Sequence, residues 1–246
     1  VFALAAQQTA QWLDQNFTYK NQKILVASKG IDVASGRFLN EIFEAYVARG
    51  NLAYLSGPSF ATEVMQKLPC ALVVSSCNEN LAELFASAFP AYIKTYTSGD
   101  IIGAEVCGAY KNVIAIASGV CDGLGLGNNA RASLIARGIV EIARFGKFFG
   151  ARDETFLGLS GVGDLFLTAS SVLSRNYRVG LGLARGKGLE EILRELGEVA
   201  EGVATTEAVV NIATKHKIYA PIATEVAQIL HGKDVRASLK DLLRKK

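Results

Sequence analysis

The chain has 246 residues, half of them apolar, which is enough to bury a substantial core, and we expect two domains of medium size. Its net charge of +3 is small, and Lys and Arg are mixed with Asp and Glu along the whole chain, which argues against a nucleic-acid partner. The sequence has no long polar or low-complexity run, which excludes extensive disorder and is typical of a soluble globular protein.

The four cysteines, at positions 70, 77, 107 and 121, lie in apolar runs and form neither a CxxC pair nor a cluster with histidine. We therefore expect reduced, buried thiols, which favour a cytoplasmic protein over a secreted one. His216 and His231 are interpreted as surface residues or helix C-terminal caps, so the sequence predicts no metal site.

The longest weakly charged stretch runs from Val106 to Cys121 and contains Lys111 and Asn112. Polar residues within so short an apolar run argue against a membrane span. We interpret the stretch as a helix that is buried in the protein core.

The first hundred residues alternate helical and strand patterns. A helical repeat of apolar residues predicts helices, and short apolar runs between turn residues predict strands. The predicted elements are a helix over 2–16, a strand over 23–28, a helix over 37–49 closed by Gly50, a weak strand over 51–55, a strand over 70–75, a helix through Ala88 with Asn78 as N-cap, and an extended segment over 91–96. Such alternation indicates an α/β fold in which helices cover a sheet.

The strand signals stop after Ser98, and helical patterns take over. Helices are predicted over 130–149, over 205–215, from Pro221 onward and over 234–244. We therefore expect a domain boundary near residue 98, with a sheet-containing domain over 1–98 and a helical domain over 99–246.

The glycine-rich turn of dinucleotide-binding folds, G-x-G-x-x-G, does not occur in the sequence. The pair Gly123-x-Gly125 is followed by Asn128 where the third glycine would stand, and Gly180-x-Gly182 is followed by Arg185. Because those glycines let the backbone approach a pyrophosphate, composition and spacing alone predict no nucleotide site.

Five ordered segments resemble one known family. They are Ala27-Ser28-Lys29-Gly30-Ile31, Leu55-Ser56-Gly57-Pro58-Ser59-Phe60-Ala61, Gly108-Ala109-Tyr110-Lys111-Asn112-Val113, Gly161-Val162-Gly163-Asp164-Leu165 with Ser174-Arg175-Asn176, and Val199-Ala200-Glu201-Gly202. Over roughly residues 1 to 230 the chain is similar to NAD(P)-dependent glycerol-3-phosphate dehydrogenases. Each segment alone is weak, but the ordered set is specific.

The resemblance implies an α/β fold, with a partial Rossmann-like dinucleotide-binding domain followed by an all-helical substrate domain. It implies an oxidoreductase of glycerophospholipid biosynthesis that interconverts sn-glycerol 3-phosphate and dihydroxyacetone phosphate, with NAD or NADP as cofactor and, by analogy, a homodimer. The family's first βαβ units, with their Gly-rich turn, would lie before Val1. A polypeptide of these residues alone is therefore expected to have little or no activity.

Lys111 is the residue that the resemblance makes catalytic. It is the only charged residue between Glu105 and Asp122, and the alternative is a lysine that reaches solvent from a buried helix. Reduction of a ketone by hydride needs an acid that protonates the developing alkoxide, and a lysine can serve if burial or a second cation lowers its pKa. We expect Lys111 as general acid/base, with Lys29 as the second cation, which also orients the substrate oxygens and contacts the cofactor.

The remaining candidate residues each have a structural alternative. By resemblance, the substrate residues are Gly57, Ser59, Asp164, Ser174, Arg175 and Asn176, and the further cofactor residues are Ala61, Arg175, Val199 and Glu201. Asp164 would contact the substrate hydroxyls and hold Lys111 in place; the alternative is a helix N-cap after a glycine turn. Ser174 to Asn176 suit a phosphate near a helix start, or form only a cap with a solvated arginine. The Gly57 segment could be only a strand-to-helix turn capped by Ser59, and Glu201 only an exposed carboxylate in a loop before a helix at Thr205.

Two other functions stay open at this point. A related dehydrogenase could act on a β-hydroxy acid, although the Arg175 cluster suits a phosphate better. The chain could instead be a non-catalytic fragment or binding module without the Gly-rich cofactor loop.

Overall fold

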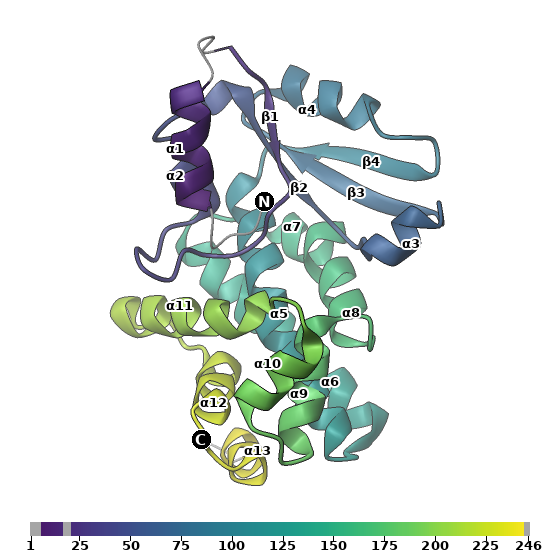
Figure 1. Cartoon of the computed structure of the whole chain (residues 1–246), viewed down its shortest axis with the longest axis vertical. Coiled ribbons are helices and arrows are strands. Elements are labelled where there is room, and N and C mark those ends of the chain that lie inside the picture. The colour runs from purple at the N-terminus through teal and green to yellow at the C-terminus, as the bar shows by residue number, and fades with distance from the viewer. Residues whose placement is uncertain (1–5, 17–20, 244–246) are drawn as a thin grey trace. The chain divides into compact units, whose positions relative to one another are not determined.

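A computed structural model describes residues 6–16 and 21–243 of the chain (Figure 1). The described residues form two compact units. Unit 1 lies within residues 1–108 and 146–164, and unit 2 within 109–145 and 165–246. Both units are discontinuous because the chain passes from one to the other inside the helices α5 (Ile101–Gly123) and α6 (Gly127–Phe148) and at the start of α8 (Asp164–Ala169). The domain boundary near residue 98 stays a prediction.

Unit 1 contains a four-stranded sheet with the strands in sequence order, labelled in Figure 1. The strands are β1 (Ile24–Val26), β2 (Leu52–Ser56), β3 (Cys70–Ser75) and β4 (Ile93–Ser98). β1 and β2 are parallel, as are β3 and β4, whereas β2 and β3 are antiparallel. Each of the predicted extended segments is confirmed as a strand, with ends shifted by a few residues.

The helices of unit 1 are short. They are α1 (Ala6–Asn16), α2 (Leu39–Phe43), the 3-10 turn η2 (Arg49–Asn51), α3 (Ala61–Met65), α4 (Glu79–Ser87), α7 (Asp153–Leu157) and the π-type turn η3 (Leu159–Gly163). Asn78 caps α4 as predicted, because its side-chain oxygen accepts a hydrogen bond from the backbone N–H of Leu81 at 3.3 Å. Residues 2–5 of the predicted first helix lie outside the described residues.

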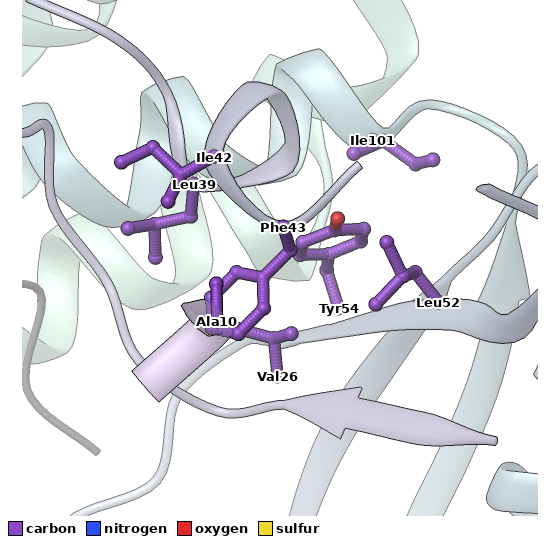
Figure 2. Packing of buried hydrophobic residues seen from close by; sticks show 8 residues of the cluster. All are labelled: Ala10, Val26, Leu39, Ile42, Phe43, Leu52, Tyr54 and Ile101. Carbon is purple, nitrogen blue, oxygen red and sulfur yellow. The ribbon is translucent and has the colours of Figure 1, made fainter. Parts of the chain in front are cut away.

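A hydrophobic core joins the helices of unit 1 to its sheet. Figure 2 shows its members converging from α1, α2, β1, β2 and the start of α5. Phe43 and Tyr54 are 2% and 3% exposed, and Leu39, Ile42 and Leu52 are equally inaccessible. Burying each such side chain stabilises the fold by about 1.5–3 kcal/mol. The cluster therefore fixes β1 and β2, the strands that precede the first candidate residues.

The predicted helix over 37–49 is wrong in its second half. α2 ends at Phe43, and the chain then turns, with the N–H groups of Tyr46 and Val47 both donating to the Phe43 carbonyl. The fully buried apolar residues of the predicted stripe lie only in its first half. The chain must reverse to enter β2 at Leu52, and this reversal occupies the residues that the periodicity assigned to the helix.

Unit 2 is helical, as predicted. Besides parts of α5, α6 and α8 it contains α9 (Arg175–Ala184), α10 (Leu189–Leu196), α11 (Glu201–His216), α12 (Pro221–Leu230) and α13 (Val235–Leu243), and the described residues 99–243 contain no strand. Pro221 opens α12, where the missing N–H has no helical partner to lose. Arg244, the predicted end of the last helix, lies outside the described residues.

Helices α5 and α9 cross in direct backbone contact. A Cβ added at Gly119 would lie 2.0 Å from the carbonyl oxygen of Tyr177, and one at Gly180 would lie 2.0 Å from that of Ile116. No side chain fits there, so glycine on both helices permits the crossing. The crossing fixes α5, which carries Lys111, against α9, which carries Arg175 and Asn176.

A buried carboxylate joins α5 and α6 to the start of α12. Glu141 accepts hydrogen bonds at 2.9 Å from the Tyr110 hydroxyl and from the backbone N–H groups of Ile222 and Ala223. Burial raises the pKa of Glu141, and the two backbone N–H groups and the hydroxyl oppose that shift. The carboxylate thereby satisfies two N–H groups that a helix start leaves without helical partners.

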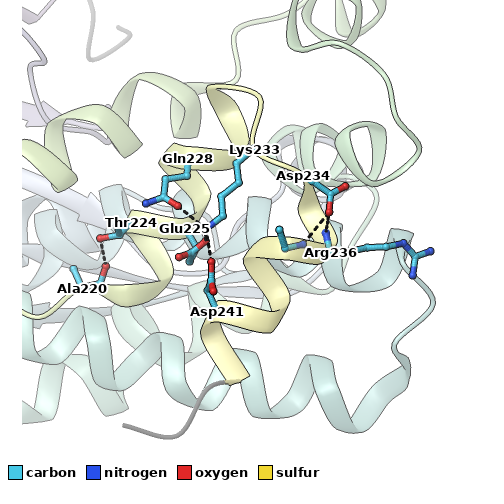
Figure 3. Close-up of polar contacts among 9 residues, drawn as sticks. Ala220, Thr224, Glu225, Gln228, Lys233, Asp234, Arg236 and Asp241 are labelled. Atoms are coloured by element: carbon cyan, nitrogen blue, oxygen red, sulfur yellow. Dashed lines mark hydrogen bonds and ion pairs between the residues drawn. The ribbon is translucent and has the colours of Figure 1, made fainter.

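A lysine outside the core connects the last two helices. Figure 3 shows Lys233 reaching Glu225 and Gln228 on α12 and Asp241 on α13, with Nζ–oxygen distances of 2.6, 2.6 and 2.8 Å. Hydrogen bonds to Asp241 and Glu225 raise the pKa of Lys233. The amine therefore stays protonated and holds the C-terminal helix in register with α12.

Two predictions about buried segments have different outcomes. Among the described residues, α5 alone is long and apolar enough to cross a membrane, but 94% of its most apolar window is buried in the structure, which confirms the buried helix. All four cysteines are free, yet only Cys107 and Cys121 are buried. The prediction of burial is wrong for Cys77, which is exposed, and for Cys70, which is half-buried at the start of β3.

Candidate active site

In unit 1, Lys29 and Asp164 form an ion pair. Lys29 follows β1 and Asp164 opens α8, and the distance from Lys29 Nζ to Asp164 Oδ2 is 2.8 Å. The Asp164 side chain is 1% exposed and that of Lys29 is 21% exposed. The stem of Lys29 packs on α5 at Gly108, where an added Cβ would lie 3.3 Å from Lys29 Cδ. The carboxylate and the helix surface together fix where the amine lies.

The loop after β2 lies next to this pair. Gly57 has a φ of +109°, and a Cβ there would lie 3.0 Å from the Ala71 carbonyl oxygen, so this backbone conformation requires glycine. Its carbonyl accepts long hydrogen bonds from Lys29 Nζ at 3.5 Å and from Ser59 Oγ at 3.4 Å. The structure therefore brings together Lys29, Gly57, Ser59 and Asp164.

The same loop is anchored to η3 by a pair of hydroxyls. The distance between Ser56 Oγ and Ser160 Oγ is 2.6 Å, and both serines are 3% exposed. This bond ties the strand end that precedes Gly57 to the turn that precedes Asp164. Sequence reasoning missed both serines, because their partnership spans 104 residues and no local pattern signals it.

The structure contradicts two of the structural alternatives given for these residues. Asp164 is not a helix N-cap: it is the first residue of α8, and its carboxylate pairs with Lys29. Ser59 is not the cap of α3 either, because Phe60 is the N-cap residue and Ala61 is the first residue of the helix. The exposed Ala61 therefore stands at the start of a helix immediately after the loop.

In unit 2, the helix α5 buries Lys111, which is 8% exposed. This burial contradicts the alternative of a lysine that reaches bulk solvent. Asn112, the next residue, is 6% exposed and belongs to a contact between three helices. Lys111 is thus a charged residue in α5 whose neighbours along the helix are almost entirely inaccessible to solvent.

The contact centres on Gly202 in α11. The backbone N–H of Gly202 donates to Asn176 Oδ1 at 2.9 Å. A Cβ at Gly202 would lie 2.6 Å from that oxygen and 2.9 Å from the Asn112 carbonyl oxygen, so only glycine fits. The segments that carry Lys111, Asn176 and Glu201 therefore meet, although they are far apart in sequence.

The segment from Ser174 to Asn176 forms the start of α9. Ser174 is its N-cap, since its Oγ accepts from the Tyr177 N–H at 3.3 Å, and the structural alternative for this hydroxyl is correct. The Arg175 side chain is 35% exposed and lies 3.4 Å from Glu198 Oε2. A cation beside N–H groups at a helix start is suited to binding an anion.

The placement of Glu201 in a loop is wrong. Glu201 is the first residue of α11, after the N-cap residue Ala200, and only Val199 of the predicted pair lies in the preceding loop, where it is 43% exposed. The helix starts before Thr205 because Asn176, on another helix, satisfies the N–H of Gly202. A cap supplied from a distant segment leaves no signal in the local sequence.

A further buried acid was not singled out by the sequence. Glu105 lies on α5, is 7% exposed, and accepts a hydrogen bond at 2.9 Å from the backbone N–H of Asn40 in α2. Burial raises the pKa of Glu105 well above its ordinary value, and nearby Glu41 and Glu44 raise it further against the effect of the Asn40 bond. In the sequence, Glu105 stands out only as the last charged residue before Lys111.

Comparison with known proteins gives consistent results over nearly the whole chain. One family model, described as NAD-dependent glycerol-3-phosphate dehydrogenase N-terminus, matches residues 1–82, and another, described as the C-terminus, matches residues 100–240. The glycerol-3-phosphate dehydrogenase (NAD(P)+) of Campylobacter lari is 63% identical over 246 residues, which are 100% of this chain and 82% of that protein. That of Sulfurimonas denitrificans is 62% identical over 243 residues, or 99% and 82% of the two chains.

Solved structures give the same fold. The crystal structure of glycerol-3-phosphate dehydrogenase from Coxiella burnetii matches with a TM-score of 0.94 and 36% identity, over 100% of this chain and 75% of that chain. This match confirms the predicted fold class, a Rossmann-like domain followed by a helical domain. The chain belongs to the NAD-dependent glycerol-3-phosphate dehydrogenase family.

Proposed function

We propose that this protein is an oxidoreductase that interconverts sn-glycerol 3-phosphate and dihydroxyacetone phosphate with NAD(H) or NADP(H), in glycerophospholipid biosynthesis. The observation that carries the proposal is its identity of 62–63% with glycerol-3-phosphate dehydrogenases (NAD(P)+) along almost the entire chain. A dehydrogenase of a β-hydroxy acid is less favoured, because the family models that match residues 1–82 and 100–240 both describe a glycerol-3-phosphate dehydrogenase. A non-catalytic fragment is likewise less favoured.

Lys111 is proposed as the general acid/base. In the reductive direction its ammonium group donates a proton to the oxygen that becomes an alkoxide, and in the oxidative direction the neutral amine removes that proton. Its burial, at 8% exposed, supports this role because a buried amine is held in place. Proton transfer by a positioned side chain contributes roughly 100- to 10,000-fold to turnover.

Lys29, Gly57, Ser59 and Asp164 are proposed to bind the carbon-bound oxygens of the substrate. The 2.8 Å ion pair supports a shared role for Lys29 and Asp164, because it holds one cationic donor and one anionic acceptor side by side. Alcohol groups can accept from the first and donate to the second. Asp164 would also help to hold Lys111 in place.

Ser174, Arg175 and Asn176 are proposed to bind the substrate phosphate. The Ser174 oxygen accepts a backbone N–H, and its own hydrogen remains a donor toward an anion. The half-exposed guanidinium of Arg175 presents a planar set of donors that matches phosphate oxygens, and each such bond is worth about 1.5–3 kcal/mol. Asn176 instead uses its oxygen for Gly202, so its amide NH₂ is the group that would contact substrate.

NAD or NADP, when bound, supplies or accepts the hydride. The parallel strands β1 and β2 end at Val26 and Ser56, and the carboxyl ends of parallel strands are where such cofactors bind. The close approach of Gly57 to Ala71 on β3, which only glycine permits, fixes the loop at this strand end. We propose Lys29, Ala61, Arg175, Val199 and Glu201 as the residues that contact the cofactor.

We also propose a cytoplasmic location and a homodimeric state. The free state of all four cysteines supports a reducing compartment. The homodimer rests on analogy with the commonest symmetry of soluble oligomers.

The test of the proposed function is the oxidation of NADH and NADPH, followed by absorbance, by the intact protein with any residues that precede Val1, since residues 1–246 alone are expected to have little or no activity. We expect oxidation with dihydroxyacetone phosphate and none with a non-phosphorylated keto acid of similar size. Equal rates with both substrates would favour the β-hydroxy acid alternative, and the absence of any oxidation would favour the non-catalytic alternative.

A further inference from the structure

Two buried polar groups in unit 1 lie at the same small cavity. Among residues 6–16 and 21–243, nothing forms a hydrogen bond with Glu105 Oε2 or with the hydroxyl of Tyr54. Tyr54 is 3% exposed and Glu105 is 7% exposed, so neither side chain lies open to bulk solvent. A buried polar group without a partner is energetically costly, which makes two such groups at one place significant.

The cavity has the size of one water molecule. Its free space, counted for the centre of a water-sized sphere, is about 10 Å³, and Glu105, Tyr54 and residues 28–30 line it. A cavity needs roughly 10–15 Å³ on this measure, and two to four polar partners, to hold a water. The two orphaned groups supply two of those polar partners.

The third wall of the cavity is the loop that carries Lys29. Residues 28–30 follow β1 and include Lys29, which pairs with Asp164. The stem of Lys29 packs on α5 at Gly108, three residues after Glu105 on the same helix. Lys29 therefore lines the cavity, and its amine reaches the carboxylate of Asp164. Whatever fills the cavity therefore contacts the loop that carries the amine.

We infer that this cavity is a binding site for a single water, held by Glu105 and Tyr54, and that Glu105 is a positioning residue for Lys29. The inference rests on the proposed role of Lys29 in binding substrate. The hydroxyl of Tyr54 and a protonated Glu105 each donate to the water, and the hydrogens of the water are then directed to acceptors in the loop. The raised pKa of Glu105 agrees with a protonated acid at this place.

The kinetic test compares Glu105→Leu, Glu105→Gln and Tyr54→Phe. Leucine removes the polar group, and we expect the KM for dihydroxyacetone phosphate to rise about fivefold or more, the factor of roughly one lost hydrogen bond, with a smaller change in kcat. Glutamine keeps an acceptor for the Asn40 N–H and a polar group at the cavity, so its KM should stay within about twofold of wild type. Ser238→Ala, which removes a buried unpartnered hydroxyl in unit 2, is the control and should leave KM unchanged.

The double variant separates a shared water from two independent effects. Tyr54→Phe should raise KM about two- to fivefold in the wild-type background and should have no further effect in Glu105→Leu, because the water is already lost. Fully additive effects, or a Glu105→Leu variant that is merely less stable with an unchanged KM, would overturn the inference.

A crystal structure provides a readout that does not depend on turnover. We expect electron density for one water between Glu105 Oε2 and the Tyr54 hydroxyl in the wild-type protein, and none at that place in Glu105→Leu. A dry cavity in the wild-type protein would overturn the inference even if the enzyme is active. Density for the water in a protein without activity would instead leave the site standing and contradict the proposed function.

Discussion

Lys29 and Asp164 lie 135 residues apart in sequence and yet form a 2.8 Å ion pair, in which the carboxylate is almost completely buried. An isolated buried carboxylate is strongly unfavourable, and the ion pair with the Lys29 amine offsets part of that cost. The amine in turn has a fixed position that a solvated lysine would lack. The pair converts two flexible charged groups into one rigid arrangement of donor and acceptor.

Replacement of Asp164 by Asn should weaken substrate binding. The variant keeps the shape of the side chain and removes its charge, so we expect the KM for dihydroxyacetone phosphate to rise about 10- to 150-fold, equivalent to a lost charged hydrogen bond of about 1.5–3 kcal/mol. Steady-state kinetics provide the measurement. Asp153→Asn is the matched control, because its ion pair with Lys147 is exposed on both sides and should contribute little. Equal effects of the two substitutions would contradict the role of Asp164.

Replacement of Arg175 by Ala should raise the KM for the phosphorylated substrate by about 10- to 150-fold, since a guanidinium–phosphate contact is worth about 1.5–3 kcal/mol. Arg178→Ala, on an exposed face of the same helix, should leave KM unchanged. An unchanged KM in Arg175→Ala would remove this residue from the phosphate site.

The crossing of α5 and α9 should not tolerate a methyl group. We expect Gly119→Ala and Gly180→Ala each to reduce the free energy of unfolding by about 3 kcal/mol or more, because the new Cβ meets a backbone carbonyl that no rotamer change can move. Urea denaturation measures the loss. Gly50→Ala, where nothing lies within 4 Å of the added Cβ, should change the unfolding free energy by less than about 1 kcal/mol. Wild-type stability in both crossing variants would show that the helices do not meet there.

The raised pKa of Glu105 predicts a particular pH dependence of stability. Because the folded state binds this proton more tightly than the unfolded chain, stability is lost as pH rises above the ordinary pKa of 4.5 toward the raised folded value. Glu105→Gln has no such proton, so the unfolding free energy of wild type minus that of the variant should fall between pH 4.5 and neutrality. The charges that face Glu105 are Glu41 and Glu44, and Glu44 is also paired with Arg49 at 3.5 Å. Parallel pH curves from urea denaturation of the two proteins would contradict the prediction.

Local signals in the sequence were sufficient for much of the fold. The strand over 70–75 and the cap at Asn78 are defined by neighbouring residues, and both are confirmed. The turn that ends α2 was missed because it depends on where the chain must enter β2, not on apolar spacing. The start of α11 was missed for a similar reason, since its cap comes from Asn176, 26 residues away from Gly202.

The candidate site was predictable as a set of residues and not as an arrangement. The resemblance supplied Lys29 and Asp164, but the ion pair between them is a tertiary contact that no local pattern encodes. The apolar run around Lys111 predicts a buried helix but leaves open whether the lysine reaches solvent, and the structure shows that it is buried. The sequence contains no signal for Glu105 and Tyr54. An isolated acid and a tyrosine in a strand become significant only when the cavity that both line is known.

The most direct test of the account is the turnover of Lys111→Met, whose side chain keeps the length of lysine and cannot transfer a proton. After wild-type turnover has been measured in the same assay, we expect kcat for dihydroxyacetone phosphate reduction to fall roughly 100- to 10,000-fold. Lys215→Met, at an exposed position of α11, should retain the wild-type rate. A kcat near the wild-type value in Lys111→Met would contradict the proposed general acid/base.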